Sequence, residues 1–156
     1  MNNNFEQRNE LLQFIWRWKL LSTAAICAKF FPLLKPYSAY QRLNRLERNG
    51  FIKAVRSSID SEQTWTLTAK GFSIVKEMLP ELKESGFKSE KIDHDQIVTA
   101  VHLGEQIFDC RPDIISFTEQ ELRRYDPEFY PRQIPKTKIH RPDGYWIASN
   151  GSQSKL

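Results

Sequence analysis

The sequence predicts an α+β fold, and three observations lead to this prediction. A segment from Tyr37 to Asn49 has helical periodicity with a basic face, two short runs rich in β-branched and aromatic residues follow it, and "LTAKG" then begins another helix. The chain has 156 residues, of which 40% are hydrophobic and 12% aromatic, so packed cores can form in one ordinary domain or two small ones. We expect two small units.

Two helices are expected before the basic segment. The first lies in "NELLQFIWRW", where the apolar residues at helical spacing are Leu11, Leu12, Ile15 and Trp16. The second, "STAAICAKFF", begins with Ser22 as a natural N-cap. Its buried side is expected to consist of Ile26, Phe30 and Phe31. The two prolines of "PLLKPY" then end this helix and begin the next.

The basic helix, which Gly50 ends, has two different faces. Residues placed about 100° apart put Ala39, Leu43 and Leu46 on one apolar stripe. The residues on the opposite face are Tyr37, Gln41, Asn44, Arg45 and Arg48. Arg can bind guanine, Asn and Gln can bind adenine, and each can bind a phosphate, so this face suits the DNA major groove. The spacing does not specify which contact each residue makes, and a solvated basic face without a DNA contact is the alternative.

A β-hairpin is expected after the basic helix. Its strands lie in Phe51 to Ile59 and Thr64 to Leu67, separated by the polar "DSEQ". Lys53 and Arg56 can reach a flanking phosphate or the minor groove, although exposed basic residues are common on strands without such a role. Trp65 is expected in the core. A closing helix follows, with Thr68 as its cap and a stripe of Phe72, Val75 and Leu79.

This order of elements is that of a winged helix-turn-helix, with the hairpin as the wing. Residues 1–79 contain 12 Lys and Arg against 6 Asp and Glu, a net charge of +6, whereas residues 80–156 contain 11 against 13, a net charge of −2. The basic character therefore belongs to the first half, and it favours double-stranded DNA as the partner over a membrane surface.

The compartment is predicted from what the sequence lacks. No apolar run approaches the roughly 20 residues that span a bilayer, and the beginning "MNNNFEQRNE" has no signal-peptide pattern. We expect a cytoplasmic protein. Cys27 and Cys110 fit no metal-ligand spacing, so two reduced thiols are expected and a structural zinc site is not.

The second half is predicted to be α/β. Residues 80–91, "PELKESGFKSEK", are polar and have the composition of a linker. In "DHDQIVTAVHLGEQIF" the apolar residues at helical intervals are Ile97, Val101, Leu103 or Gly104, and Phe108. "DIISFTEQELRR" is expected to be a short buried strand followed by a charged segment, and a further strand is expected from Tyr145.

The order of these motifs resembles the replication-relaxation family of plasmid and mobile-element proteins. The resemblance lies in the winged helix ending in "LTAKG", the His-Asp pair of "HDQIVTAVHL", "TEQELRR" and the late "HRPDGYW". It implies a DNA-binding protein of plasmid replication, mobilisation or transcriptional control, whose second half is similar to the PD-(D/E)xK restriction-endonuclease fold. In that fold acidic residues and a Glu-x-Lys hold Mg²⁺ and position water.

Carried onto this chain, the resemblance makes Glu119 and Asp143 the candidate catalytic and Mg²⁺-binding residues, with His94 as an accessory. The third element is missing. Asn150-Gly151 is expected to form a hairpin turn that sets Asp143 opposite a position just past Leu156, and Gln153-Ser154-Lys155 lies too close to that turn. We therefore expect an incomplete module, truncated or degenerate, or a fragment of a longer chain.

The same residues also have ordinary structural interpretations. His94 and His102 are typical of hydrogen-bonded helix residues, and Asp143 before Gly144 is typical of a turn. Glu119 and Glu121 are typical of a solvated helix start. No Ser-His-Asp arrangement, phosphate loop or dinucleotide-binding turn occurs in the sequence.

The sequence thus predicts a winged helix-turn-helix DNA-binding domain (1–79), a linker (80–91) and a small, incomplete α/β restriction-endonuclease-like module (92–156). A non-catalytic DNA-binding protein without a cofactor is the favoured hypothesis, and a metal-dependent nuclease that uses Mg²⁺ is the alternative. A winged helix that only binds protein is the third hypothesis, since the fold alone does not imply DNA. A homodimer is compatible with all three, because many winged-helix proteins bind as two-fold dimers.

Overall fold

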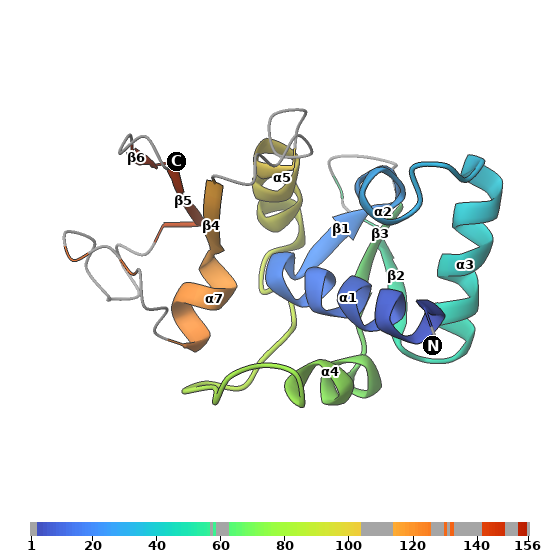
Figure 1. The fold of residues 1–156 in the computed structure, drawn as a ribbon, viewed down its shortest axis with the longest axis horizontal. Helices are drawn as coiled ribbons and strands as arrows, with labels where there is room; N and C mark the ends of the chain where they lie inside the picture. The colour runs from blue at the N-terminus through green and yellow to red at the C-terminus, as the bar shows by residue number, and fades with distance from the viewer. Residues whose placement is uncertain are drawn as a thin grey trace.

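A computed structural model describes residues 3–56, 58, 63–103, 114–125, 130, 132, 142–148 and 153–155 (Figure 1). The elements in chain order are α1 (Asn3–Trp18), β1 (Leu20–Ser22), α2 (Thr23–Phe30), α3 (Pro36–Arg48), β2 (Ile52–Arg56), β3 (Gln63–Leu67), α4 (Ala69–Lys76), α5 (Ile92–His102), β4 (Ile114–Thr118), α7 (Glu119–Arg124), β5 (Gly144–Ala148) and β6 (Gln153–Lys155). The fold is therefore α+β, as predicted. Within the described part of the chain, no helix is long and apolar enough to cross a membrane.

The first sheet gives residues 3–76 the topology of a winged helix-turn-helix. Its strand order is β1-β3-β2 with antiparallel pairing throughout, and β2 and β3 form the predicted wing. β1 was not predicted. It has three residues, and it forms because Leu21 pairs with Trp65, far along the chain, so no local pattern indicates it. Of the wing residues, 57 and 59–62 lie outside the described ones, and so does much of the "DSEQ" turn.

The core of the winged helix consists of the predicted apolar faces. Trp16, Leu43 and Trp65 have no exposed surface, and Trp65 Nε1 donates a hydrogen bond to Thr23 Oγ1 at 2.9 Å. The role predicted for Trp65, a core anchor, is confirmed. α1 lies across the sheet, while α3 stands at the edge of the molecule (Figure 1). One side of α3 is therefore available to a partner.

Capping side chains fix the helix boundaries that the sequence predicts. Ser22 Oγ accepts a hydrogen bond from the backbone N–H of Ala25 at 3.0 Å, and Thr68 Oγ1 accepts one from Gly71 at 3.1 Å. Gly50 ends α3 with a φ of 75°, a left-handed backbone conformation that residues with a Cβ rarely adopt. α4 is shorter than expected, because it ends at Lys76 before Leu79.

We expect the replacement of Gly71 by Ala to destabilise the winged helix strongly. A Cβ at this position would lie 2.0 Å from the carbonyl oxygen of Phe51, which is a backbone atom that accepts a hydrogen bond from Thr68. Relieving that overlap requires the wing to shift, and overpacking of this kind costs about 1–3 kcal/mol or more. Urea unfolding of the variant measures the loss. An Ala at Ser73, an exposed position of α4, is the matched control.

The segment 80–91, expected to be a linker, has no helix or strand, but it contacts the winged helix as well as α7. The carbonyl oxygen of Gly86 accepts hydrogen bonds from Trp16 Nε1 at 2.9 Å and from Gln120 Nε2 at 3.0 Å. Phe87 stacks on Phe72 with the ring centroids 4.9 Å apart. These contacts attach α7 to α1 and α4 through the segment.

α5 packs with a different face from the one that the sequence pattern indicates. Ile97 and Val101 are 52% and 55% exposed, whereas Asp95, Thr99 and His102 are buried. Leu103, directly after α5, is buried in the core as its place in the pattern indicates, but within the helix the apolar spacing is a wrong guide to the buried side. Polar contacts favour this orientation. Thr99 Oγ1 lies 3.2 Å from the backbone oxygen of Leu20 and shares its proton between that atom and the backbone oxygen of Asp95 at 2.7 Å, and the Asp95 carboxylate forms an ion pair with Lys19. Gly104 and Phe108 lie outside the described residues.

The second sheet has the strand order β4-β5-β6, with antiparallel pairing. Ile147 pairs with Gln153 and Tyr145 with Lys155, so β5 and β6 are antiparallel neighbours. The turn residues Asn150 and Gly151 lie outside the described ones. The described pairing covers Tyr145–Ile147 of β5, so the partner expected opposite Asp143 stays a prediction.

Candidate functional site

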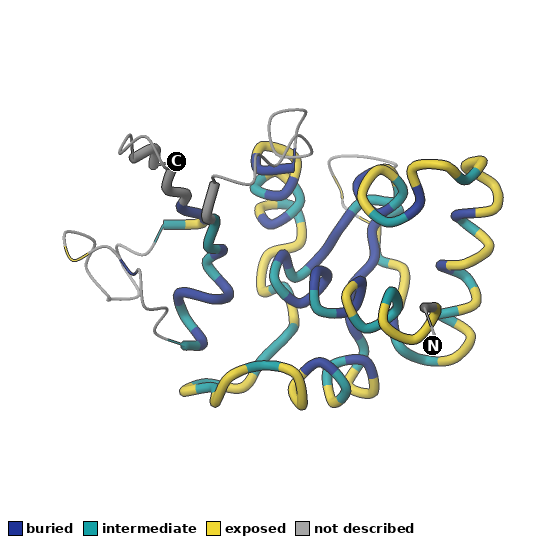
Figure 2. Tube along the Cα trace, in the orientation of Figure 1, coloured by how far each residue is buried: buried dark blue, intermediate teal, exposed yellow. Residues whose placement is uncertain are grey.

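The outer face of α3 is the first candidate site, and it has the predicted composition. Tyr37 is 73% exposed, Gln41, Arg45 and Arg48 are exposed, and Asn44 is half-buried. Figure 2 shows α3 at the edge of the molecule with exposed positions along its length. The opposite side is held in the core by Ala39 and Leu43. All five candidate residues therefore lie on one helix that packing holds in place.

The wing supports this helix and adds two basic residues. Lys53 and Arg56 are exposed on β2, where they pair with Thr66 and Gln63 of β3. Glu47 of α3 accepts a hydrogen bond from the backbone N–H of Ala54 at 2.8 Å. This bond fixes the end of α3 against the strand that carries the two basic side chains.

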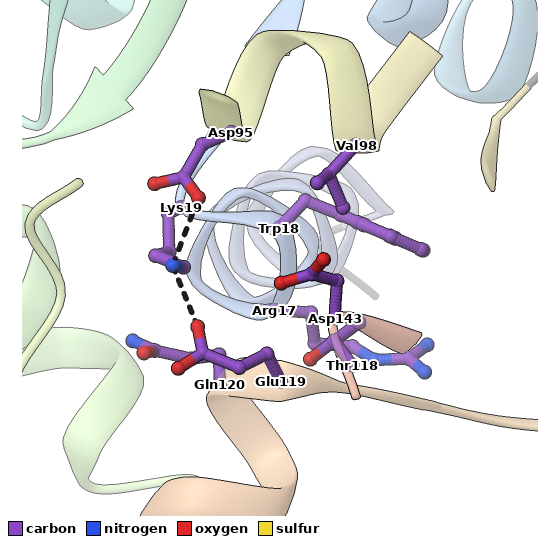
Figure 3. A pocket seen from close by; sticks show the side chains of 9 residues that line it. All are labelled: Arg17, Trp18, Lys19, Asp95, Val98, Thr118, Glu119, Gln120 and Asp143. Carbon is purple, nitrogen blue, oxygen red and sulfur yellow. Dashed lines mark hydrogen bonds and ion pairs between the residues drawn. The ribbon is translucent and has the colours of Figure 1, made fainter. Parts of the chain in front are cut away.

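The second candidate site is a small crevice where the winged helix meets α5 and α7 (Figure 3). Lys19 is one of the residues that line it, in a left-handed backbone conformation with a φ of 63° between α1 and β1. Its Nζ is 3.0 Å from Asp95 Oδ1 and 2.7 Å from Glu119 Oε2. Lys19 and Asp95 were not predicted as site residues, because nothing local in the sequence indicates that residue 19 meets residues 95 and 119.

The crevice brings together the residues that the nuclease hypothesis names. Asp143 lines it, and its backbone oxygen accepts a hydrogen bond from the N–H of Glu119 at 2.9 Å. Asp143 Oδ2 lies 3.6 Å from His94 Nε2, and both side chains are about half exposed. Glu119, Asp143 and His94 are thus neighbours in space, although Glu119 forms its ion pair with Lys19.

The described residues do not fit a Mg²⁺ ion. The ammonium of Lys19 lies between the carboxylates of Asp95 and Glu119, where a cation would bind. The free space is about 10 Å³, which is about enough for one water molecule, and Mg²⁺ usually keeps several waters. Among the residues described, no group of three His, Cys, Asp or Glu can hold a metal ion.

The environment of Lys19 favours its protonated form. Burial lowers the pKa of Lys19, but hydrogen bonds and charge attraction from Glu119 and Asp95 outweigh this effect, so the pKa lies above its ordinary value. Asp95 is 5% exposed, and its Oδ2 has no hydrogen-bond partner among the described residues. The crevice therefore holds a buried ion pair that joins the winged helix to α5 and α7.

Glu121 differs from its expected role. The structural interpretation of the sequence places it in a solvated helix start, but it is buried. It forms a capping box with Thr118 and an ion pair with Arg17, in which Nε lies 2.9 Å from Oε1. The nearby Glu119 is half-buried. The reason is that α7 packs on α1, which the sequence does not indicate.

Histidine 102 should make the stability depend on pH. It is 3% exposed against Trp18, and burial lowers the pKa of His102 below its ordinary 6.5 although the charge of Asp143 opposes this. Below about pH 6.5 the unfolded state therefore binds more protons at this histidine than the folded state does. The contribution of the neutral His102 to the free energy of unfolding is fully present above pH 6.5 and is lost as the pH falls toward the lower folded-state pKa. Urea unfolding at pH 7 and pH 5 measures this loss, which should be smaller in His102→Gln. An equal loss in the variant would show that other groups cause it.

No family model matches the chain, and neither does any curated protein. Among solved structures, the chain is similar to ZitR of Lactococcus lactis in a Cys-to-Ser variant, with 23% identity and a TM-score of 0.39 over 47% of this chain and 49% of that one. For a double variant of ZitR in its apo form the values are 23% and 0.41, over 49% and 57%. The chain thus spans about half the length of these structures, and the winged-helix assignment depends on its own topology.

Proposed function

We propose that this chain binds duplex DNA through the outer face of α3, with the wing against the flanking backbone. The observation that supports the proposal is the exposed set of hydrogen-bonding and cationic side chains on a helix whose other side is fixed in the core. Gln41, Asn44, Arg45 and Arg48 would contact bases, with Tyr37 at the start of the same face. Lys53 and Arg56 would contact phosphates, which position the protein without specifying sequence.

The biological setting belongs to the same proposal. The sequence resemblance to the replication-relaxation family implies a role in plasmid replication, mobilisation or transcriptional control. A non-catalytic role is favoured because Lys19 occupies the acidic crevice, as described above. We propose a cytoplasmic, sequence-specific DNA-binding protein that acts as a regulator or an accessory factor.

The test is selection from a pool of random duplex DNA by the purified full chain. Binding is measured at two salt concentrations with and without Mg²⁺, and the bound fraction is sequenced while the input is examined on a gel. An enriched motif in intact DNA supports the proposal. Absence of binding at low salt would overturn it and leave α3 as a protein-binding surface, because nonspecific attraction to phosphate is strongest there.

A metal-dependent nuclease is the second candidate, and one observation favours it: Glu119 and Asp143 lie beside the same crevice. On this hypothesis the winged helix would select the site of cleavage. The same gel tests it. Cleavage that requires Mg²⁺ and disappears in Asp143→Ala would support the nuclease, whereas intact DNA in every lane would exclude it under these conditions. Equal cleavage by Asp143→Ala would remove Asp143 from the hypothesis.

A further inference from the structure

A groove on the winged helix lies beside α3, away from the acidic crevice. It has a volume of about 340 Å³, within the range of small-molecule sites. Its walls are the first turns of α1 and the second half of α3, which lie next to each other in Figure 1. Three arginines line it, namely Arg8, Arg42 and Arg45. None of the residues that line it is acidic.

The charges of these arginines face neutral partners. The guanidinium of Arg8 donates to Asn9 Oδ1 at 2.9 and 3.2 Å, and that of Arg42 donates to Gln7 Oε1 at 3.4 Å. Amide oxygens orient a guanidinium without neutralising it. Within the described part of the chain no carboxylate pairs with either arginine or with Arg45, so an anion entering the groove would gain charge-assisted hydrogen bonds.

The rest of the groove is apolar. Leu11 and Phe31 are buried in its wall, and Leu46 and Phe51 are half-buried. The guanidinium carbon of Arg42 lies 5.2 Å from the centre of the Phe31 ring. A ligand that matches this surface has a flat apolar body and one anionic group, because a simple inorganic anion would leave the apolar wall in contact with water.

We propose that the groove between α1 and α3 binds a small amphipathic carboxylate, and that its occupation weakens DNA binding. The coupling rests on the proposed function and runs through Arg45. This residue lies three positions from both Arg42 and Arg48 on α3, so it is a neighbour of the groove on one side and of the DNA-facing residues on the other. A carboxylate bound to Arg45 withdraws its guanidinium from DNA and neutralises its charge.

The first experiment measures ligand binding without DNA, so that it does not depend on the proposed function. Naphthalene-2-carboxylate is titrated into the full chain by calorimetry, with 2-naphthol and sodium sulfate as probes that each lack one half of the ligand. We expect saturable binding of the carboxylate at one site, and weakening by about tenfold or more in Arg42→Gln and in Arg8→Gln, because each change removes a charged hydrogen-bond donor. Lys76→Gln, an exposed cation of α4 outside the groove, is the control for lost charge and should bind the carboxylate as the wild type does.

Three results would overturn the site: no binding to the wild type, equal affinity for sulfate, or unchanged binding in both groove variants. Two variants on different helices are used so that a folding defect in one, detected by its thermal unfolding, leaves the other as a test. The second experiment repeats the titration with a duplex from the DNA selection. A lower DNA affinity in the presence of the carboxylate supports the coupling, and an unchanged affinity overturns it while the site itself stands. If the selection yields no duplex, the DNA-binding proposal fails and the groove result is unaffected.

Discussion

Replacing Gln41, Arg45 and Arg48 together by Ala is expected to remove sequence-specific DNA binding. Each side chain is exposed on the outer face of α3, and a good base contact contributes about 1–3 kcal/mol of discrimination. The loss of three such contacts amounts to about 3 kcal/mol or more, which is over a hundredfold in Kd. Competition binding against the enriched duplex and a scrambled duplex measures the loss.

The controls for this variant separate a lost contact from lost charge or lost folding. The variant removes two positive charges, so Lys76→Ala with Lys91→Ala, two exposed lysines outside α3, removes the same number. We expect the lysine variant to keep its preference for the enriched sequence. Unfolding of the triple variant should change by no more than about 0.5 kcal/mol, because the replaced residues are at the surface. Unchanged affinity in the triple variant would show that α3 is not the DNA-binding element.

The parts of the fold that the sequence predicted are those determined by neighbouring residues. The periodicity of α3 places Ala39 and Leu43 inward, and the caps at Ser22 and Thr68 depend on hydrogen bonds to residues three positions away. The candidate DNA-binding face follows from the same local pattern. This face could be predicted from the sequence because the regular geometry of a helix fixes the direction of each side chain along its length.

The parts that the sequence did not predict depend on residues far apart in the chain. β1 forms only against β3, and the burial of Glu121 depends on Arg17 of α1. The orientation of α5 is the clearest case, since a helix usually buries its apolar residues. Here Ile97 stays exposed because the opposite side of α5 is held, with Asp95 bound to Lys19 and Thr99 in contact with Leu20 of β1. The residues of the acidic crevice are brought together by the same contacts.

Replacing Lys19 by Met is expected to be among the most damaging single changes in the chain. Met has an unbranched side chain that matches Lys except for the terminal ammonium, so the left-handed backbone at residue 19 is strained to a similar extent in both, and the difference isolates the ammonium. Without it, Asp95 remains a buried carboxylate that has lost its ion pair, and removing one partner of such a pair costs about 3–5 kcal/mol. Urea unfolding at pH 7 measures the change.

The pH dependence and a second variant test the cause of this loss. Because the pKa of Lys19 lies above its ordinary 10.5, the contribution of the ammonium is complete below that pH and is lost as the pH rises through the higher folded-state pKa. The wild type and Lys19→Met should therefore approach each other in stability above about pH 10.5.

Adding Asp95→Asn to Lys19→Met should restore part of the loss, since it neutralises the carboxylate. If Lys19→Met unfolds like the wild type at pH 7, or if Asp95→Asn restores nothing, the ion pair does not join the winged helix to α5. If both effects occur, the ammonium between Asp95 and Glu119 stabilises the fold, and a Mg²⁺ ion could bind these carboxylates only at the cost of that stabilisation.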